Sequence, residues 1–266
     1  MGIDGGSGRD WEAKQPHFEG IVGKSPRAFT RDEDEERPSS TRCGFVQTMD
    51  TPSTRRLYEV LQSQGFQLNQ PITFLADGGD TVRDLPRSMS PEAEHIVDGL
   101  HLTMRLTVLD QYGKGLVHGD QVLGEEMRQQ IERLKWSLWH GNRVKALDKI
   151  DDIASLIDTF EESYPKCKQL LKAVEAFRPS ITNNGHLIPH DGERYRHGAA
   201  RATGFVESTV HQVVRKRFCK QQQMQWSKRG AHRLLQTRVK TLNRAVGSLF
   251  KQWYPDMEVE EVPDAA

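Results

Sequence analysis

The stretch Pro71-Ile72-Thr73-Phe74-Leu75-Ala76-Asp77-Gly78-Gly79 is a short apolar run that ends in an acidic, glycine-rich turn. An uninterrupted apolar run of this length, bounded by turn residues, is typical of a strand that is buried on both faces. Strands of this kind lie in sheets that helices cover. The stretch therefore predicts a buried strand of an α/β fold, with Asp77 at its carboxyl end.

Further strands and helices are predicted on both sides of this run. Three strands that can form a meander come first, and alternating helices and strands follow, which indicates a mixed sheet with helices on its faces. In chain order, these elements are strands at 1–4, 17–22 and 42–47, a helix from 51 that Gly65 ends, the strand at 71–76, a short helix through Val82 and Leu85, a strand at 93–97 and a helix through Leu102, Leu106 and Leu109.

The next part of the chain, at 119–177, is predicted to be an all-α insertion. Apolar side chains recur there with the helical period, for example at Met127, Ile131, Leu134 and Leu138. Proline, glycine, asparagine and histidine are dense at 179–198, which predicts a loop. A helix is expected to start near Gly204, and its apolar stripe is formed by Val206, Val210, Val213 and Phe218.

These patterns predict four segments: the first part of a sheet-containing core at 1–116, the α-helical insertion at 117–180, the last part of the core with basic helices at 181–255, and an acidic tail at 256–266. No run of about 18 apolar residues is present, so no membrane span is expected, and the start has no signal-peptide pattern. Cys43, Cys167 and Cys219 form no CxxC pair. Neither a zinc site nor a disulfide framework is expected, and the interpretation is a cytoplasmic protein with reduced thiols.

The net charge is zero, but the charges are unevenly distributed. Residues 30–36 are acidic, whereas 208–255 contain no Asp or Glu at all. A long basic segment without carboxylates indicates a polyanionic partner, most simply a nucleic acid. The alternative is an ordinary solvated helix surface, although such surfaces usually mix both signs. The basic residues of the segment are Arg215, Lys216, Arg217, Lys220, Lys228, Arg229, Arg233, Arg238, Lys240, Arg244 and Lys251.

Three carboxylates are candidates for metal-dependent chemistry on phosphodiesters. Asp4 and Asp77 each follow a predicted strand and precede two glycines, which would let a DNA backbone approach closely. Glu207 is a lone acid at a helix start, just before the carboxylate-free segment. Divalent ions such as Mg²⁺ prefer carboxylate oxygens. The alternatives are ordinary Asp-Gly turns at 4–8 and 77–79, and a glutamate stabilised by the helix dipole.

Several motifs resemble the ISKra family of insertion-sequence transposases, which is close to the Mutator-like group. They are Met-Gly-Ile-Asp-Gly-Gly-Ser-Gly-Arg-Asp-Trp-Glu at 1–12, His-Phe-Glu-Gly-Ile-Val-Gly-Lys at 17–24, Pro-His-Asp-Gly-Glu-Arg-Tyr-Arg at 189–196, Phe-Val-Glu-Ser-Thr-Val at 205–210 and Gln-Trp-Ser-Lys-Arg-Gly-Ala-His at 225–232. The resemblance implies an RNase H-like fold and a DDE triad of Asp4, Asp77 and Glu207 that holds two Mg²⁺ or Mn²⁺ ions.

The same resemblance implies supporting residues and partners. Asp98 and His101 resemble an Asp/Cys-x-x-His element that supports the site or the DNA, with Asp98 as the substitute if Asp77 is not the second acid. The alternative for His101 is an ordinary interior histidine whose hydrogen bonds are satisfied within the fold. Trp136 and Trp139 are interpreted as core residues of the insertion, and the alternative is stacking on a transposon end. The implied partners are double-stranded DNA, namely inverted-repeat ends and target, and further copies of the chain. The DNA-binding residues would be Arg215, Lys216, Arg217, Lys220, Lys228, Arg229 and Arg233.

Two other functions stay open at this point. Only three residues precede Asp4, and Ser7-Gly8 stands where the family tends to have an aromatic residue. A catalytically inactive, truncated transposase that only binds DNA is therefore the alternative to an active enzyme. A host nuclease of the same fold is the third hypothesis, and it would cut DNA without preferring inverted-repeat ends.

Overall fold

The computed structural model describes residues 1–10, 17–26, 40–49, 53–67, 70–79, 82, 85–86, 89–90, 92–160, 165–218 and 226–256. The chain divides into two compact units. The first consists of Met1–Ala28, Glu36–Gln70 and Phe205–Ala266, and the second of Phe29–Glu35 and Pro71–Gly204. Each unit is described by itself.

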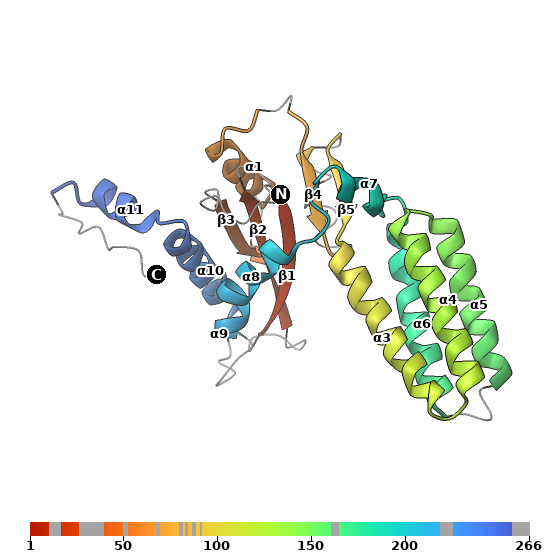
Figure 1. The fold of residues 1–266 in the computed structure, drawn as a ribbon. Coiled ribbons are helices and arrows are strands. Elements are labelled where there is room, and N and C mark those ends of the chain that lie inside the picture. The colour runs from red at the N-terminus through yellow and green to blue at the C-terminus, as the bar shows by residue number, and fades with distance from the viewer. Residues whose placement is uncertain are drawn as a thin grey trace. The chain divides into compact units, whose positions relative to one another are not determined.

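The first unit contains three antiparallel strands, β1 (Gly2–Arg9), β2 (His17–Pro26) and β3 (Ser40–Val46), with β2 in the middle (Figure 1). The register pairs Asp4 with Val22 and Val22 with Gly44. Because directly paired residues of antiparallel strands point to the same face, these three positions share one face of the strands.

Helices cover both faces of these strands. A Cβ atom built on Gly23 would lie 3.2 Å from Leu57 of α1, whereas one on Gly44 would lie 3.0 Å from Val239 of α10. Since Gly23 and Gly44 point to opposite faces, α1 covers one face and α10 the other. The helical segments of this unit are η1 (Gln47–Met49), α1 (Ser53–Ser63), α8 (Gly204–Val210), the π-helical η2 (His211–Arg215), α9 (Lys216–Phe218), α10 (Lys228–Leu242) and α11 (Val246–Trp253).

The face opposite α1 carries one hydrophobic core. Its buried members come from the strands, from the helix that starts at Gly204 and from α10. The predicted helical stripe is confirmed, because all four of its side chains are buried there. The core consists of Phe18, Val22, Val46, Val206, Val210, Val213, Val214, Phe218, Ala231, Leu235 and Val239.

The second unit contains a pair of parallel strands, β4 (Thr73–Ala76) and β5 (Glu94–Val97). Both lie within the strands predicted at 71–76 and 93–97. The unit also contains α3 (Gly99–Val117), α4 (Gln121–Trp139), α5 (Arg143–Phe160), α6 (Pro165–Asn184) and α7 (Asp191–Arg196). The chain is therefore α/β, with antiparallel and parallel strands and helices packed on strands, as predicted.

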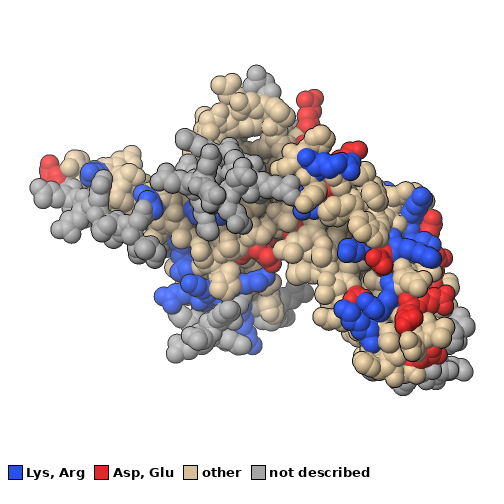
Figure 2. Space-filling view, in the orientation of Figure 1, with Lys and Arg blue, Asp and Glu red and all other residues tan. Residues whose placement is uncertain are grey.

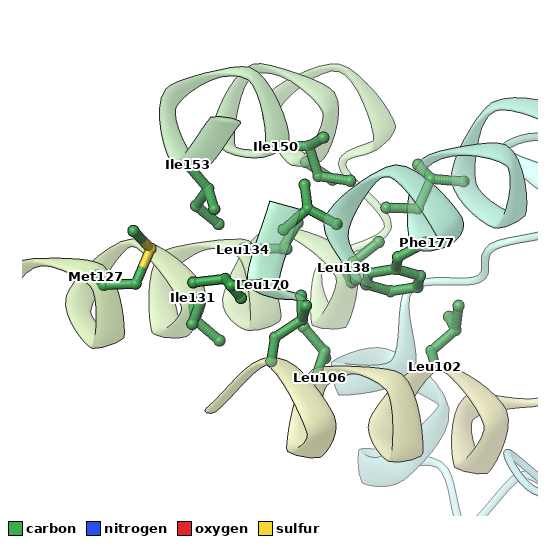
Figure 3. Close-up of a cluster of buried hydrophobic side chains, with 14 of the residues drawn as sticks. Leu102, Leu106, Met127, Ile131, Leu134, Leu138, Ile150, Ile153, Leu170 and Phe177 are labelled. Atoms are coloured by element: carbon green, nitrogen blue, oxygen red, sulfur yellow. The ribbon is translucent and has the colours of Figure 1, made fainter. Parts of the chain in front are cut away.

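Helices α3 to α6 form a four-helix bundle in which each helix contacts its two neighbours (Figure 1). Figure 3 shows side chains from these helices pointing toward one another in the shared core, including Leu106, Leu134 and Phe177. The predicted all-helical region is present, but the bundle begins at Gly99 rather than at 117, because α3 packs against α4 and α6.

Two predictions of local structure are wrong. The loop predicted at 179–198 contains the last turns of α6 and the short helix α7. Helix α6 continues through Pro179 because Phe177 and Ile181 on either side are anchored in the bundle core. The turn predicted at 5–8 is instead part of β1, since those residues pair with β2 along their whole length.

Among the described residues, no helix combines the length and the hydrophobicity that crossing a membrane would require.

Candidate functional site

Asp4 lies within β1 rather than at its end, and it faces α8. Gly2, Asp4 and Gly6 share one face of the strand because side chains alternate. A Cβ atom on Gly2 would lie 2.2 Å from Val206, and one on Gly6 would lie 3.1 Å from Val210. Asp4 stands between these two contacts. It therefore points toward the helix that carries Glu207.

The Asp4 carboxylate is buried and held in place. Its exposed fraction is 5%, and its Oδ1 atom accepts a hydrogen bond of 2.8 Å from the backbone N–H of Gly5. On the opposite face of the strand, a Cβ atom on Gly5 would lie 2.6 Å from Oε1 of Glu19. The end of a second carboxylate, that of Glu19, therefore lies against the backbone at Gly5, which the sequence pattern did not reveal.

Glu207 follows Val206 and precedes Val210 by three residues on α8, so it borders the face that packs on β1. Its side chain is half-buried. Within the described part of the chain, its carboxylate makes no hydrogen bond or ion pair. Lys24 of β2 donates a hydrogen bond of 3.0 Å to the carbonyl of Phe205 and so brings a cation to the start of the same helix.

Asp77 directly follows β4 in the second unit, as predicted. Its Oδ1 atom accepts a hydrogen bond of 2.9 Å from the backbone N–H of Gly79. Gly78 has a φ of +82°, and a Cβ atom there would lie 2.7 Å from Nδ2 of Asn184, so only glycine fits. The Asp-Gly turn at 77–79, the alternative to a metal ligand, is therefore present, and Asp77 also lines a cavity.

This cavity has a volume of about 300 Å³ and a polar lining. Asn184 is 5% exposed, and within the described residues its Oδ1 atom has no hydrogen-bond partner. The Nε2 atom of His101 is also buried without a hydrogen bond among the described residues. Unsatisfied buried polar atoms favour a bound water or ligand group. The lining residues are Asp77, Gly78, Gly79, Val97, His101, Leu102, Arg105, Pro179, Ser180, Asn183 and Asn184.

Asp98 is fully buried and acts as the N-cap of α3. Its Oδ1 atom accepts hydrogen bonds from the backbone N–H groups of Leu100, at 2.8 Å, and Thr203, at 3.1 Å. Its Oδ2 atom accepts from the hydroxyl of Thr203 and lies 3.8 Å from Nε2 of His101, beyond hydrogen-bonding distance. Asp98 therefore uses both oxygens within the fold, and this arrangement suits a positioning role.

Asp4 and Glu207 belong to the first unit, whereas Asp77, Asp98 and His101 belong to the second. The structure brings Asp4 and Glu207 onto facing elements, and it brings Asp77 and His101 to one cavity. Among the described residues, no group of three or more His, Cys, Asp or Glu side chains is arranged to hold a metal ion.

The predicted DNA-binding residues are mostly exposed. Arg215, Lys216 and Arg217 follow Glu207 and are open to solvent, and so are Arg229 and Arg233 at the start of α10. Figure 2 shows Lys and Arg side chains gathered over the part of the chain that Figure 1 labels α9 and α10.

Two other cations of this segment, Lys228 and Arg238, are partly buried rather than open to solvent. Lys228 is half-buried and lies 3.8 Å from the buried carboxylate of Asp10. Burial, helped by the nearby charge of Arg217, lowers the pKa of Arg238. The predicted contact Lys220 lies outside the described residues.

Comparisons with protein-family models, with curated proteins and with solved structures found no match.

Proposed function

We propose that this chain is the catalytic region of a DDE-type transposase with an RNase H-like fold, which cuts DNA and joins the cut end to a target. The packing of the Asp4 face of β1 on α8, the helix that carries Glu207, is the observation that carries this proposal. Carboxylates on rigid, packed elements keep the fixed geometry that a metal-dependent site needs. The motifs around both residues support the same assignment.

The donor chemistry fits Mg²⁺ or Mn²⁺. Carboxylate oxygens are the hard ligands that these ions prefer, and the amide of Gly5 already orients the Asp4 carboxylate. We assign Asp4 and Glu207 of the first unit as metal ligands, and the family resemblance of the sequence motifs implies Asp77 as the third. When bound, two such ions activate the attacking oxygen and stabilise the leaving oxygen of a phosphodiester.

The other residues of the chain would bind and position. Exposed Arg215, Lys216 and Arg217 follow Glu207 in sequence and can hold phosphates of double-stranded DNA. Asp98 fixes Thr203, which precedes Glu207 by four residues. The expected DNA partners are the inverted-repeat ends and the target. Joining two ends calls for at least two copies of the chain, so a homo-oligomer is part of the proposal.

The test is Mn²⁺-dependent nicking of a labelled duplex by the purified parent protein beside an Asp77→Asn variant. The proposal predicts nicking by the parent and its loss in the variant, with circular dichroism unchanged. A folded parent that binds DNA without nicking it would contradict the enzyme and support the DNA-binding remnant. Equal nicking of duplexes with and without inverted-repeat ends would instead favour a host nuclease.

A further inference from the structure

Two aromatic side chains of the second unit are exposed to solvent. Trp136 on α4 is 48% exposed, and Tyr195 on α7 is 45% exposed. Among the described residues of this unit, no other Phe, Trp or Tyr side chain is exposed. The interpretation of Trp136 as a core residue is therefore wrong. Large exposed aromatic groups that lie close together can form a binding site.

Both exposed rings contact Trp139, which is half-buried between them. The ring centroid of Trp139 lies 6.3 Å from that of Trp136 and 6.2 Å from that of Tyr195. A Cβ atom on Gly192 would lie 2.9 Å from Nε1 of Trp139, so the indole rests directly on the backbone of α7. The ring of His140 stacks on Trp136, with centroids 6.2 Å apart and planes at 27°.

Cations lie against these rings. Nζ of Lys135 is 5.7 Å from the ring centroid of Trp136. The guanidinium carbon of Arg201 is 5.1 Å from the ring centroid of Trp139 and 4.9 Å from that of Tyr195. Each exposed aromatic thus has a cation within the range of cation–π attraction. We name Trp136, Trp139, His140 and Tyr195, with Lys135 and Arg201, the aromatic platform.

We propose that the aromatic platform binds an unpaired nucleobase of a DNA strand. Every base has a π-face that can stack on an exposed indole or phenol, whatever its sequence. The cations beside the rings can contact the phosphates that flank such a base. Acidic Glu132 and Glu193 lie on the same helices, so bulk attraction by positive charge is weak here, and stacking is the main interaction.

This inference extends the proposed function, on which it rests for DNA as the polymer. It adds a contact outside the carboxylate site, and that contact is suited to a strand whose bases are exposed by cutting or by distortion. Unstacking a base from a duplex is costly, and a dedicated stacking site repays part of that cost.

The test compares two labelled oligonucleotides in EDTA, where no cutting occurs. One is an oligothymidylate, and the other is an abasic strand of the same length and charge. Fluorescence anisotropy is measured for the parent, for Trp136→Ala and for Val122→Ala, a control because Val122 is 78% exposed on the same helix and carries no ring. The proposal predicts that Trp136→Ala weakens binding of the thymidylate strand about tenfold. Binding of the abasic strand and both affinities of Val122→Ala should stay at parental values.

Two further variants keep the test decisive if Trp136→Ala folds poorly. Trp136→Phe should retain most of the affinity because a ring remains, whereas Tyr195→Ala should lose affinity for the thymidylate strand only. Thymidylate binding by Trp136→Ala and Tyr195→Ala at parental strength would overturn the proposal. So would an equal loss for both strands, which would indicate a charge or folding effect. If the parent does not nick DNA but still binds the thymidylate strand more tightly than the abasic strand, the proposed enzyme is contradicted. The aromatic platform would then remain supported.

Discussion

The carboxylate of Asp98 accepts two hydrogen bonds from Thr203, one from the backbone N–H and one from the hydroxyl, although 105 residues separate them in the chain. Both side chains are buried, at 0% and 1% exposure. The pair ties the first turn of α3 to the segment that leads into α8. Asp98 therefore controls the position of the chain four residues before Glu207.

Thr203→Val should reveal the strength of this connection. The substitution keeps the side-chain shape but removes the hydroxyl donor, which leaves Oδ2 of buried Asp98 with one partner fewer. We expect the free energy of unfolding to fall by about 1–3 kcal/mol. Urea denaturation measures it, with Thr182→Val as the control because that exposed hydroxyl only bonds within its own helix. Equal effects of the two substitutions would argue against a special role for Thr203.

Asp191, at the start of α7, should make stability depend on pH. Burial raises the pKa of its carboxyl, although the charges of Arg201 and Arg194 oppose that shift. The folded state therefore favours the neutral acid, and the carboxyl costs stability as pH rises above its ordinary pKa of 3.8.

Asp191→Asn removes this cost. The variant should be more stable than the parent at pH 7, and the difference should shrink as pH falls and vanish well below the ordinary pKa of 3.8, where the acid is protonated in both states. Denaturation midpoints at several pH values check this prediction. A variant that is less stable than the parent at pH 7 would mean that the charged form is favoured in the fold.

Gly6→Val should disrupt the packing of α8 and η2 on β1. A Cβ atom at this position would lie 2.9 Å from Cγ1 of Val214, closer than real contacts allow. Overpacking of this kind costs about 1–3 kcal/mol. Gly204→Ala is the control because a Cβ atom there has open space. Thermal unfolding should show a clear loss for the first variant and none for the second.

The exposed cations after Glu207 should determine how DNA binding depends on salt. Replacing Arg215, Lys216 and Arg217 together by Gln should weaken binding to all duplexes alike. The slope of log affinity against log salt should fall by about one for each lost phosphate contact. A triple variant with Gln at Arg133, Lys145 and Lys172, which are exposed on the helical bundle, is the control. Equal slopes for the two variants would show that the basic segment does not bind phosphates.

Much of this architecture could be predicted from residue patterns. The apolar run before Asp77 forms β4, and the stripe after Gly204 forms a buried helix face, because burial leaves a strong periodic signal. Gly65 ends α1 with a φ of +86°. Glu207 lies beside that stripe in the structure, as its position in the sequence predicts.

Other features could not be predicted, because distant contacts decide them. The glycines after Asp4 have the composition of a turn, yet they extend β1 because Val210 and Val214 need close approach to the strand. Pro179 lies inside α6 because the bundle core holds the helix on both sides of it. The cavity beside Asp77 depends on Asn184, and nothing in the local sequence connects the two residues.

The most direct test of the account is Mn²⁺-dependent nicking by Glu207→Gln, compared with the parent and with Glu59→Gln. The first substitution removes the charge of Glu207, beside the α8 face that packs on β1, but keeps the shape of the side chain, and the second changes an exposed glutamate paired with Arg55. The account predicts that Glu207→Gln lowers the nicking rate at least about 100-fold while Glu59→Gln leaves it unchanged. Nicking by folded Glu207→Gln at the parental rate would contradict it.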